Sequence, residues 1–309
     1  MPALRRSGVS GVIGEEASDV QVPAPFEYER ATSVEHALGL LAERHDARVL
    51  AGGYSLLPMM KLRLATPECL IDIDDLAGEL GYVEQHDDQI RIGAMARHRQ
   101  LLESPLLSRL APIFIDAERV IADPIVRNRG TIGGALCQAD PSEDLSAVCT
   151  ALDAEMVIRG LGGVRTVPMD EFYRGPYRTA VADDELLIEI RIPTRERSGS
   201  AYEKVNRRVG DWAVVAAGAA LSLSDGLIAH AGIALVAVGA DVTSGAAQDV
   251  VVDREPSDEL FEQAGRAAAA ACTPVSDQRG SAEYKRHVAA VLVTRALQRA
   301  AARAAEAVA

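Results

Sequence analysis

Arg48–Leu62, with the sequence RVLAGGYSLLPMMKL, is the stretch on which the fold of this chain depends. It opens with a short apolar run that suits a buried strand and is too short for a helix. Two glycines follow, Gly52 and Gly53, and then a second apolar segment of helical character. A strand, a Gly-Gly turn and a helix leave backbone N–H groups unshielded by Cβ atoms, which suits the phosphates of a nucleotide.

A second stretch, Gly130–Leu145, repeats this pattern with the sequence GTIGGALCQADPSEDL and adds a cluster of carboxylates. Most Gly-Gly pairs are ordinary turns, so either stretch alone is weak evidence for a phosphate site. A third glycine cluster, GLGG at 160–163, lies between two strand-like runs and is better explained as a hairpin turn. Two glycine loops in apolar surroundings favour nucleotide binding without identifying the nucleotide.

Composition and charge narrow the class of protein. The 309 residues are 48% hydrophobic and 25% charged, which is typical of globular proteins, and the length suggests about two domains. The formal net charge of −13 disfavours nucleic acid and anionic membranes as partners. No apolar run reaches the roughly 18 residues that a membrane-spanning helix needs. We therefore expect a soluble, acidic protein without a membrane span.

The spacing of cysteine and histidine gives no sign of a metal centre. The four cysteines form no C-x-x-C pair and the six histidines form no H-E-x-x-H pattern, so this chain alone offers no zinc or iron–sulfur ligand set. A disulfide framework is not indicated either, so we expect a cytoplasmic protein with reduced, buried thiols at Cys69, Cys137, Cys149 and Cys272.

Periodicity and turn residues predict the elements around the first glycine loop. Residues 1–22, with a weak G-x-x-G-x-x-G match at 8–14, are expected to form a flexible tail. Ser33 is the expected N-cap of a helix over Val34–Arg44 that leads into the first strand and its loop. Further strands are expected at 69–73, 80–85, 89–93, 155–159, 164–167 and 186–192, and helices over 96–117, with breaks at two prolines, and 145–152.

Pro193 and the RERSGS stretch after it suggest a domain boundary, and the residue pattern changes from Ala201 onward. Residues 214–222 and 227–238, joined by Ser-Asp-Gly, give a strong hairpin signal. Helices are expected over 258–271 and from 281 to the end. We expect this part to be a separate α+β domain of three strands and two or more helices.

Several segments, in a fixed order, identify a family. They are AGGYSLLPMMKLRLATPECLIDI (51–73), IADPIVRNRGTIGGALCQADPSEDL (121–145), LLIEIRIP (186–193), AYEKVNRRVGDWA (201–213) and TPVSDQRGSAEYKRHVAAVLVTRAL (273–297). With them the chain resembles, from about Pro25 to Ala304, the FAD-binding medium subunit of the molybdenum hydroxylases. That family includes aerobic carbon monoxide dehydrogenase and xanthine dehydrogenase.

The resemblance implies a fold of class α+β with stated boundaries. A two-part FAD-binding domain of the vanillyl-alcohol oxidase (PCMH) type would occupy 23–197, with subdomains of about 23–79 and 80–197. A carbon monoxide dehydrogenase flavoprotein C-terminal domain would follow over 198–309.

The resemblance also implies which residues bind FAD. Both glycine loops would hold its diphosphate through Ala51, Gly52, Gly53, Tyr54, Ser55, Thr131, Ile132, Gly133, Gly134 and Ala135. Further FAD-contacting positions match Asp144, Leu186 and Lys204, and Trp212 falls where a relative has a tyrosine over the isoalloxazine ring. No catalytic side chain and no metal ligand is expected, because electron passage requires no protein acid or base.

Some of these residues also have a purely structural interpretation. A lone tryptophan is more often part of a core than of a ligand site, and Lys204 would otherwise be a solvated strand residue. Asp140, before a proline, can equally serve to shape a turn. Met59 and Met60 are expected to pack in the core. Ala135 departs from the family pattern, as does Tyr54, and it offers no side-chain hydrogen bond near the flavin loop.

The resemblance implies a role in electron transfer. A large molybdopterin-binding subunit would oxidise the substrate, and a small subunit with two [2Fe–2S] clusters would carry electrons to FAD on this chain. A quinone, NAD or oxygen would then accept them, and we expect a dimer of such heterotrimers. Two alternatives remain open: a free-standing FAD-dependent reductase of the cell-wall (UDP-N-acetylenolpyruvoylglucosamine reductase) type, and a non-catalytic interaction subunit.

Overall fold

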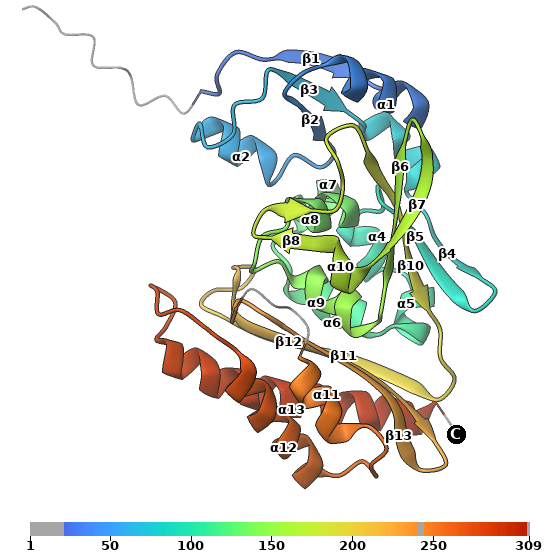
Figure 1. The fold of residues 1–309 in the computed structure, drawn as a ribbon, viewed down its shortest axis with the longest axis vertical. Coiled ribbons are helices and arrows are strands. Elements are labelled where there is room, and N and C mark those ends of the chain that lie inside the picture. The colour runs from blue at the N-terminus through green and yellow to red at the C-terminus, as the bar shows by residue number, and fades with distance from the viewer. Residues whose placement is uncertain (1–21, 240–243, 308–309) are drawn as a thin grey trace, which may run out of the picture.

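A computed structural model of the chain describes residues 22–239 and 244–307. The expected N-terminal tail, with its glycine pattern at 8–14, lies outside these residues. Three parts follow one another along the longest axis, from the N-terminal unit at the top of Figure 1 to the C-terminal helices at the bottom. None of the helices among the described residues combines the length and apolarity needed to span a membrane.

The N-terminal unit is a three-stranded parallel sheet that carries the first glycine loop. Its strands are β1 (Glu27–Arg30), β2 (Ala47–Leu50) and β3 (Cys69–Asp72), in the order β1–β3–β2. Helix α1 (Val34–Glu43) begins at Ser33, whose hydroxyl accepts the N–H of His36 at 3.1 Å, so the predicted N-cap is confirmed. Residues 51–55 connect β2 to α2 (Leu56–Lys61), and η1 (Asp74–Leu76) and α3 (Ala77–Leu80) follow β3.

The central part is built on a five-stranded antiparallel sheet. Its order is β4–β5–β10–β6–β7, with bounds β4 (Val83–His86), β5 (Gln89–Gly93), β6 (Glu155–Gly160), β7 (Gly163–Pro168) and β10 (Leu186–Pro193). The glycine cluster at 160–163 is the predicted hairpin turn between β6 and β7. The strand predicted from residue 80 starts three residues later, because Leu80 ends α3.

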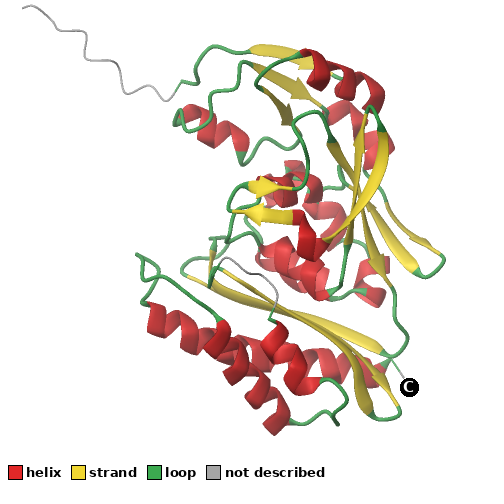
Figure 2. Ribbon diagram, viewed as in Figure 1, coloured by secondary structure: helices red, strands yellow, loops and turns green. Residues whose placement is uncertain are grey.

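Short helices cover one face of this sheet (Figure 2). The helical segment predicted over 96–117 consists of three helices, because each of Pro105 and Pro112 ends one helix and lies at the start of the next. The helices are α4 (His98–Leu102), α5 (Pro105–Leu110), α6 (Ile113–Val120), α7 (Pro124–Arg129), α8 (Ile132–Gln138), α9 (Asp144–Ala151) and α10 (Met169–Phe172), and a small ribbon pairs β8 (Tyr173–Gly175) with β9 (Arg178–Thr179).

The C-terminal part is a three-stranded antiparallel sheet between two layers of helices. Strands β11 (Ser198–Asn206), β12 (Ala213–Ser224) and β13 (Leu227–Val236) pair in that order, which confirms the predicted hairpin. Helices α11 (Gly245–Val251) and α13 (Ala282–Glu306) pack on one face, with α12 (Asp258–Ala271) packed against both of them, and α6 and α9 of the central part pack on the other face (Figure 1).

Small residues let this sheet be buried on both faces. Alternate residues of β12 belong to different cores: Ala216 faces the central part, and Ala217 faces the C-terminal helices. A Cβ atom on Gly218 would lie 3.0 Å from the carbonyl oxygen of Ala147 on α9, and one on Gly232 would collide with that of Ala151. The absence of side chains there brings α9 directly onto the sheet.

A buried carboxylate, Asp116 on α6, ties the central part to the C-terminal helices. Its two oxygens lie 2.9 Å from Arg299 Nη2 and 2.7 Å from Arg303 Nη1 of α13. The backbone N–H of Tyr202 also donates to this carboxylate, at 3.2 Å. Removing one partner of a buried pair leaves the other groups without compensation.

Asp116→Asn is therefore expected to lower the free energy of unfolding by about 1–3 kcal/mol, the lower end reflecting the partial exposure of both arginines. Urea unfolding followed by circular dichroism measures the change. The control is Glu262→Gln, which removes an exposed pair with Arg266 on α12 and should cost less than about 0.5 kcal/mol. Equal losses in the two variants would contradict the assigned role of Asp116.

Candidate functional site

A cleft of about 590 Å³ lies between the N-terminal unit and the central part, a volume in the range of small-molecule and cofactor sites. Both glycine loops and the start of β10 line it. Of the fourteen residues predicted to bind FAD, ten line this cleft: Ala51, Gly52, Gly53, Tyr54, Ser55, Thr131, Gly133, Gly134, Ala135 and Leu186. The structure therefore brings together two segments that are about eighty residues apart in the sequence.

The first loop presents a run of unpaired donors. The backbone N–H groups of Gly52, Gly53, Tyr54 and Ser55 donate to no acceptor within the part of the chain that the structure describes. Gly53 has a φ of +82°, a conformation that favours glycine. The hydroxyl of Ser55 makes no capping hydrogen bond to α2. Consecutive free N–H groups of this kind bind phosphate oxygens, so the loop fits a diphosphate.

The second glycine pair does not form such a loop, which corrects the prediction of a Gly-Gly turn. Gly133 and Gly134 lie in the first turn of α8, with Thr131 as the N-cap. Four N–H groups of this segment already find acceptors inside the protein: Ile132 at Ala96 O (3.0 Å), Gly133 at Ala94 O (2.9 Å), Gly134 at Thr131 Oγ1 (3.1 Å) and Ala135 at Thr131 O (3.0 Å). The expectation that both loops supply backbone donors is thus wrong for the second, although the Thr131 hydroxyl can still donate its own hydrogen.

Glycines in both segments permit close backbone approach. A Cβ atom on Gly52 would lie 2.5 Å from Arg129 O and 2.7 Å from Gly130 Cα, so only glycine lets the first loop rest on the residues before α8. Arg97 reinforces this contact, because it donates to Arg129 O and pairs with Asp74 of the N-terminal unit. Burial acts to raise the pKa of Asp74, but the neighbouring arginines outweigh it and lower the pKa.

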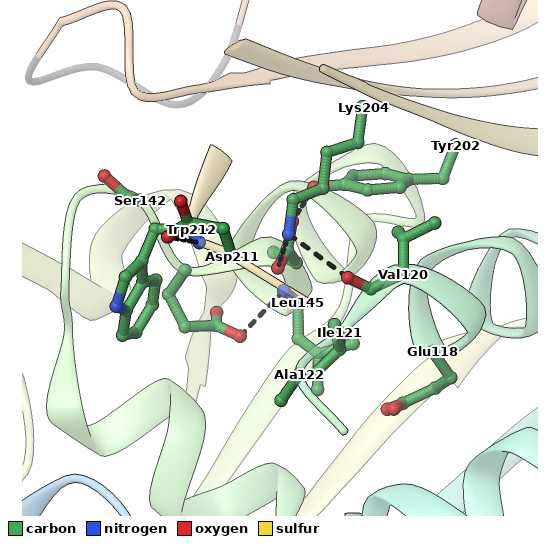
Figure 3. Close-up of polar contacts among 12 residues, drawn as sticks. Glu118, Val120, Ile121, Ala122, Ser142, Leu145, Tyr202, Lys204, Asp211 and Trp212 are labelled. Carbon is green, nitrogen blue, oxygen red and sulfur yellow. Dashed lines mark hydrogen bonds and ion pairs between the residues drawn. The ribbon is translucent and has the colours of Figure 1, made fainter. Parts of the chain in front are cut away.

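Asp144 and Lys204 form a buried ion pair that lies outside the cleft lining. Lys204 Nζ is 2.8 Å from Asp144 Oδ2, and the Tyr202 hydroxyl donates to Oδ1 at 2.6 Å (Figure 3). The side chain of Lys204 is 1% exposed, so the interpretation as a solvated strand residue is wrong. Burial raises the pKa of Asp144 despite the opposing effect of Lys204. Both carboxylate oxygens are engaged within the protein, where they join α9 to β11.

The remaining candidates are divided between the core and the surface. Ile132 is fully buried. Trp212 lies between β11 and β12 and is 42% exposed, so it is not a core residue, and Figure 3 shows its indole directed away from Lys204. Asp140 shapes a turn, as one interpretation predicted: its Oδ1 accepts the N–H of Ser142 at 2.8 Å, and its Oδ2 accepts the hydroxyl of Tyr177 at 3.0 Å.

Sequence reasoning missed several residues of the cleft. Cys137 and Met59 line it, so they are not the buried core residues that were predicted, whereas Met60 is buried. All four cysteines are free, and Cys69 and Cys149 are buried as expected. His98, at the start of α4, also lines the cleft, and no sequence motif marked it. Among the described residues, no three or more His, Cys, Asp or Glu side chains are arranged to hold a metal ion.

Comparison with known proteins identifies the family. Residues 24–195 match the FAD binding domain in molybdopterin dehydrogenase, and residues 200–300 match the CO dehydrogenase flavoprotein C-terminal domain. The chain is 40% identical over 287 residues to the carbon monoxide dehydrogenase medium chain of Hydrogenophaga pseudoflava, covering 92% of this chain and 100% of that protein. It is 28% identical over 281 residues to the xanthine dehydrogenase FAD-binding subunit of Escherichia coli O157:H7, covering 90% and 96%.

Solved structures agree with these matches. Carbon monoxide dehydrogenase from Hydrogenophaga pseudoflava superposes with a TM-score of 0.88 at 41% identity, covering 91% of this chain and 99% of that one. Quinoline 2-oxidoreductase from Pseudomonas putida 86 gives a TM-score of 0.85 at 32% identity, covering 92% and 99%.

The fold and the glycine-lined cleft define an FAD-binding flavoprotein, and the chain binds FAD. It belongs to the family of FAD-binding medium subunits of molybdenum hydroxylases, whose named members are dehydrogenases and hence oxidoreductases. The predicted order of an FAD-binding domain followed by a carbon monoxide dehydrogenase flavoprotein C-terminal domain is confirmed.

Gly53→Val tests the first loop. A branched side chain at a φ of +82°, with its Cβ 3.0 Å from Leu57 Cδ1, strains the turn and should weaken FAD binding at least about tenfold. Fluorescence titration of the flavin-free protein measures the affinity, and circular dichroism checks that the fold persists. The control is Gly39→Val, on α1, where a Cβ would meet nothing within 4 Å. Stoichiometric flavin at unchanged affinity in Gly53→Val would show that this loop does not hold FAD.

Proposed function

We propose that this chain is the FAD-bearing electron-transfer subunit of a heterotrimeric molybdenum hydroxylase. It takes electrons from the [2Fe–2S] clusters of a partner subunit and passes them to a quinone, NAD or oxygen. The observation that carries the proposal is an end-to-end match, with both glycine segments present, to a protein named as the medium chain of carbon monoxide dehydrogenase. A free-standing reductase is not favoured, because relatives that share nearly the whole chain are named as medium chains.

The diphosphate of FAD is proposed to bind at the first loop. The loop at Ala51–Ser55 provides the unpaired N–H groups of residues 52–55, and the Thr131 hydroxyl adds a donor from the second segment. Gly133 and Gly134 have no side chains to obstruct the cleft, and Ala135 and Leu186 form part of its apolar wall. The proposed FAD-binding set also includes four residues that lie outside the cleft lining: Ile132, Asp144, Lys204 and Trp212.

FAD, when bound, supplies a redox centre that accepts and releases electrons. The residues of the chain bind and orient it. The rigid contact of Gly52 with Gly130 fixes the donors of the first loop relative to α8, and the Asp144–Lys204 pair fixes α9 relative to β11. No side chain is assigned as a proton donor or acceptor in this relay.

The partners are a small iron–sulfur subunit with two [2Fe–2S] clusters and a large molybdopterin-binding subunit, assembled as a dimer of heterotrimers in the cytoplasm. The term "medium chain" in the names of the relatives supports an assembly of several subunits. We also propose the division into domains at 23–197 and 198–309, with subdomains of about 23–79 and 80–197. Family matches over 24–195 and 200–300 support the main boundary.

FAD is expected to be bound non-covalently. The first loop contains neither histidine nor cysteine, and Cys137, which faces the cleft, is a poor nucleophile. The side chain is exposed to the cleft, but the protein around it raises the pKa of its thiol above the ordinary value, so the thiol stays protonated at neutral pH. Acid precipitation should leave the yellow colour in the supernatant, for the wild type and for Cys137→Ser alike. Colour that stays in the wild-type pellet but not in the Cys137→Ser pellet would reveal a covalent link.

The subunit role predicts that the isolated FAD-loaded chain is inert toward hydroxylase substrates such as a purine, an aldehyde or carbon monoxide. Co-expression with the partner subunits should permit reduction of the flavin by one such substrate, followed as loss of visible absorbance under anaerobic conditions. Rapid reduction of the flavin in the lone chain by an organic substrate would refute the subunit role and favour a free-standing oxidoreductase.

A further inference from the structure

A buried histidine–glutamate pair lies against the wall of the cleft. His98 Nδ1 is 3.0 Å and 3.1 Å from the two carboxylate oxygens of Glu118, which α6 contributes. The histidine side chain is 7% exposed and the glutamate side chain 0%. Glu118 makes no other side-chain hydrogen bond among the described residues. Since an isolated buried carboxylate is strongly unfavourable, His98 is its compensating partner.

The second ring nitrogen of His98 lies next to Gly130, the first residue of the second glycine segment. His98 lines the cleft, and its Nε2 has no hydrogen-bond partner within the part of the chain described. A Cβ atom on Gly130 would lie 3.2 Å from Nε2 and would cover it, so glycine at this position leaves the nitrogen accessible. Gly130 in turn contacts Gly52, whose Cβ would lie 2.7 Å from Gly130 Cα. One glycine therefore separates His98 from the unpaired donors of the first loop.

The surroundings of His98 favour its charged form. Burial alone lowers the pKa of His98, but the Glu118 carboxylate outweighs this effect, and Glu143 and Asp144 at the start of α9 act in the same direction, so that the pKa is raised. Burial also raises the pKa of Glu118, with Arg127 of α7 opposing it. A protonated imidazole has two N–H donors: Nδ1–H serves Glu118, and Nε2–H is free to serve a ligand.

We propose that His98, held in place by Glu118, is a further diphosphate-binding residue that donates its Nε2–H to a phosphate of FAD. This inference rests on the proposed placement of the diphosphate at Ala51–Ser55. The backbone N–H groups of that loop and the Thr131 hydroxyl are neutral donors, to which His98 adds a charged one. Hydrogen bonds from a charged donor to phosphate are shorter and stronger than those between neutral groups.

The proposal makes FAD binding depend on pH in a defined direction. The charge of His98 is present at low pH and is lost as the pH rises through a pKa that lies above the ordinary value of about 6.5. Affinity should therefore fall with rising pH. Glu143 complicates the comparison, because burial raises its pKa to about 7 and its negative charge also develops in this range. Its contribution has to be separated from that of His98.

The experiment measures the affinity of flavin-free protein for three probes between about pH 6 and about pH 9.5, a range that begins near the ordinary histidine pKa and extends well above it. FAD and ADP carry the diphosphate, whereas riboflavin does not. The double variant His98→Gln/Glu118→Gln removes both charges and keeps a hydrogen-bonding pair of similar size. Glu143→Gln removes the competing titration, and the exposed His36→Gln on α1 is the matched histidine control.

For the wild type, Glu143→Gln and His36→Gln, we expect the affinities for FAD and for ADP to fall about tenfold or more as the pH rises. Riboflavin should show no such fall, and the fall should vanish in the double variant. Three results would overturn the proposal: a flat profile in the wild type, an unchanged slope in the double variant, or a slope seen with riboflavin but not with ADP.

If the double variant does not fold, the pH profiles of ADP affinity for the wild type and for Glu143→Gln still test the role of His98. A flat profile in both proteins refutes the proposal. A fall in affinity that persists in Glu143→Gln supports it. Failure of FAD to bind at any pH is a different outcome. It would refute the proposed function itself, and this inference with it, whereas FAD binding without pH dependence refutes only the role of His98.

Discussion

The contact of Gly52 with the backbone of Arg129 and Gly130 is the constraint on which the site depends. It lets two segments about eighty residues apart form one wall of a cleft, and it tolerates no side chain at residue 52. The Arg97–Asp74 pair holds the same junction from the side. Because the contact is between backbones, the position of the first loop relative to α8 is rigid, and its donors are fixed before a ligand arrives.

Hydrogen-bond partners distinguish the two glycine segments, which look alike as sequence. In the first loop the N–H groups of residues 52–55 are free, whereas in the second the N–H groups of residues 132–135 are used by the protein itself. The first segment therefore acts as the anion-binding loop. The second acts as a packing surface that adds the Thr131 hydroxyl and, through Gly130, exposes His98. The neutral donors of the first loop and of Thr131, and the buried His98–Glu118 pair, thus lie at the same cleft.

Elements that depend on local residue patterns could be predicted from the sequence, whereas features that depend on tertiary packing could not. Strong alternation and a Ser-Asp-Gly turn revealed the C-terminal hairpin, and prolines marked the helix breaks. β1 was missed because its residues, EYER, are mostly exposed and show no apolar pattern. α8 was taken for a turn because Gly-Gly disfavours a helix, although the N-cap Thr131 and tight packing on Ala94 outweigh this preference. The His98–Glu118 pair depends on how α4 meets α6, which no motif records.

Amide hydrogen exchange tests whether the first loop supplies the donors for FAD. In the flavin-free protein the amides of residues 52–55 should exchange rapidly, because nothing in the described chain accepts them. The amides of residues 132–135 should already be protected. On addition of FAD, we expect new protection at residues 52–55 and little change at residues 132–135. Unchanged exchange at residues 52–55 in the FAD-bound protein would contradict this expectation.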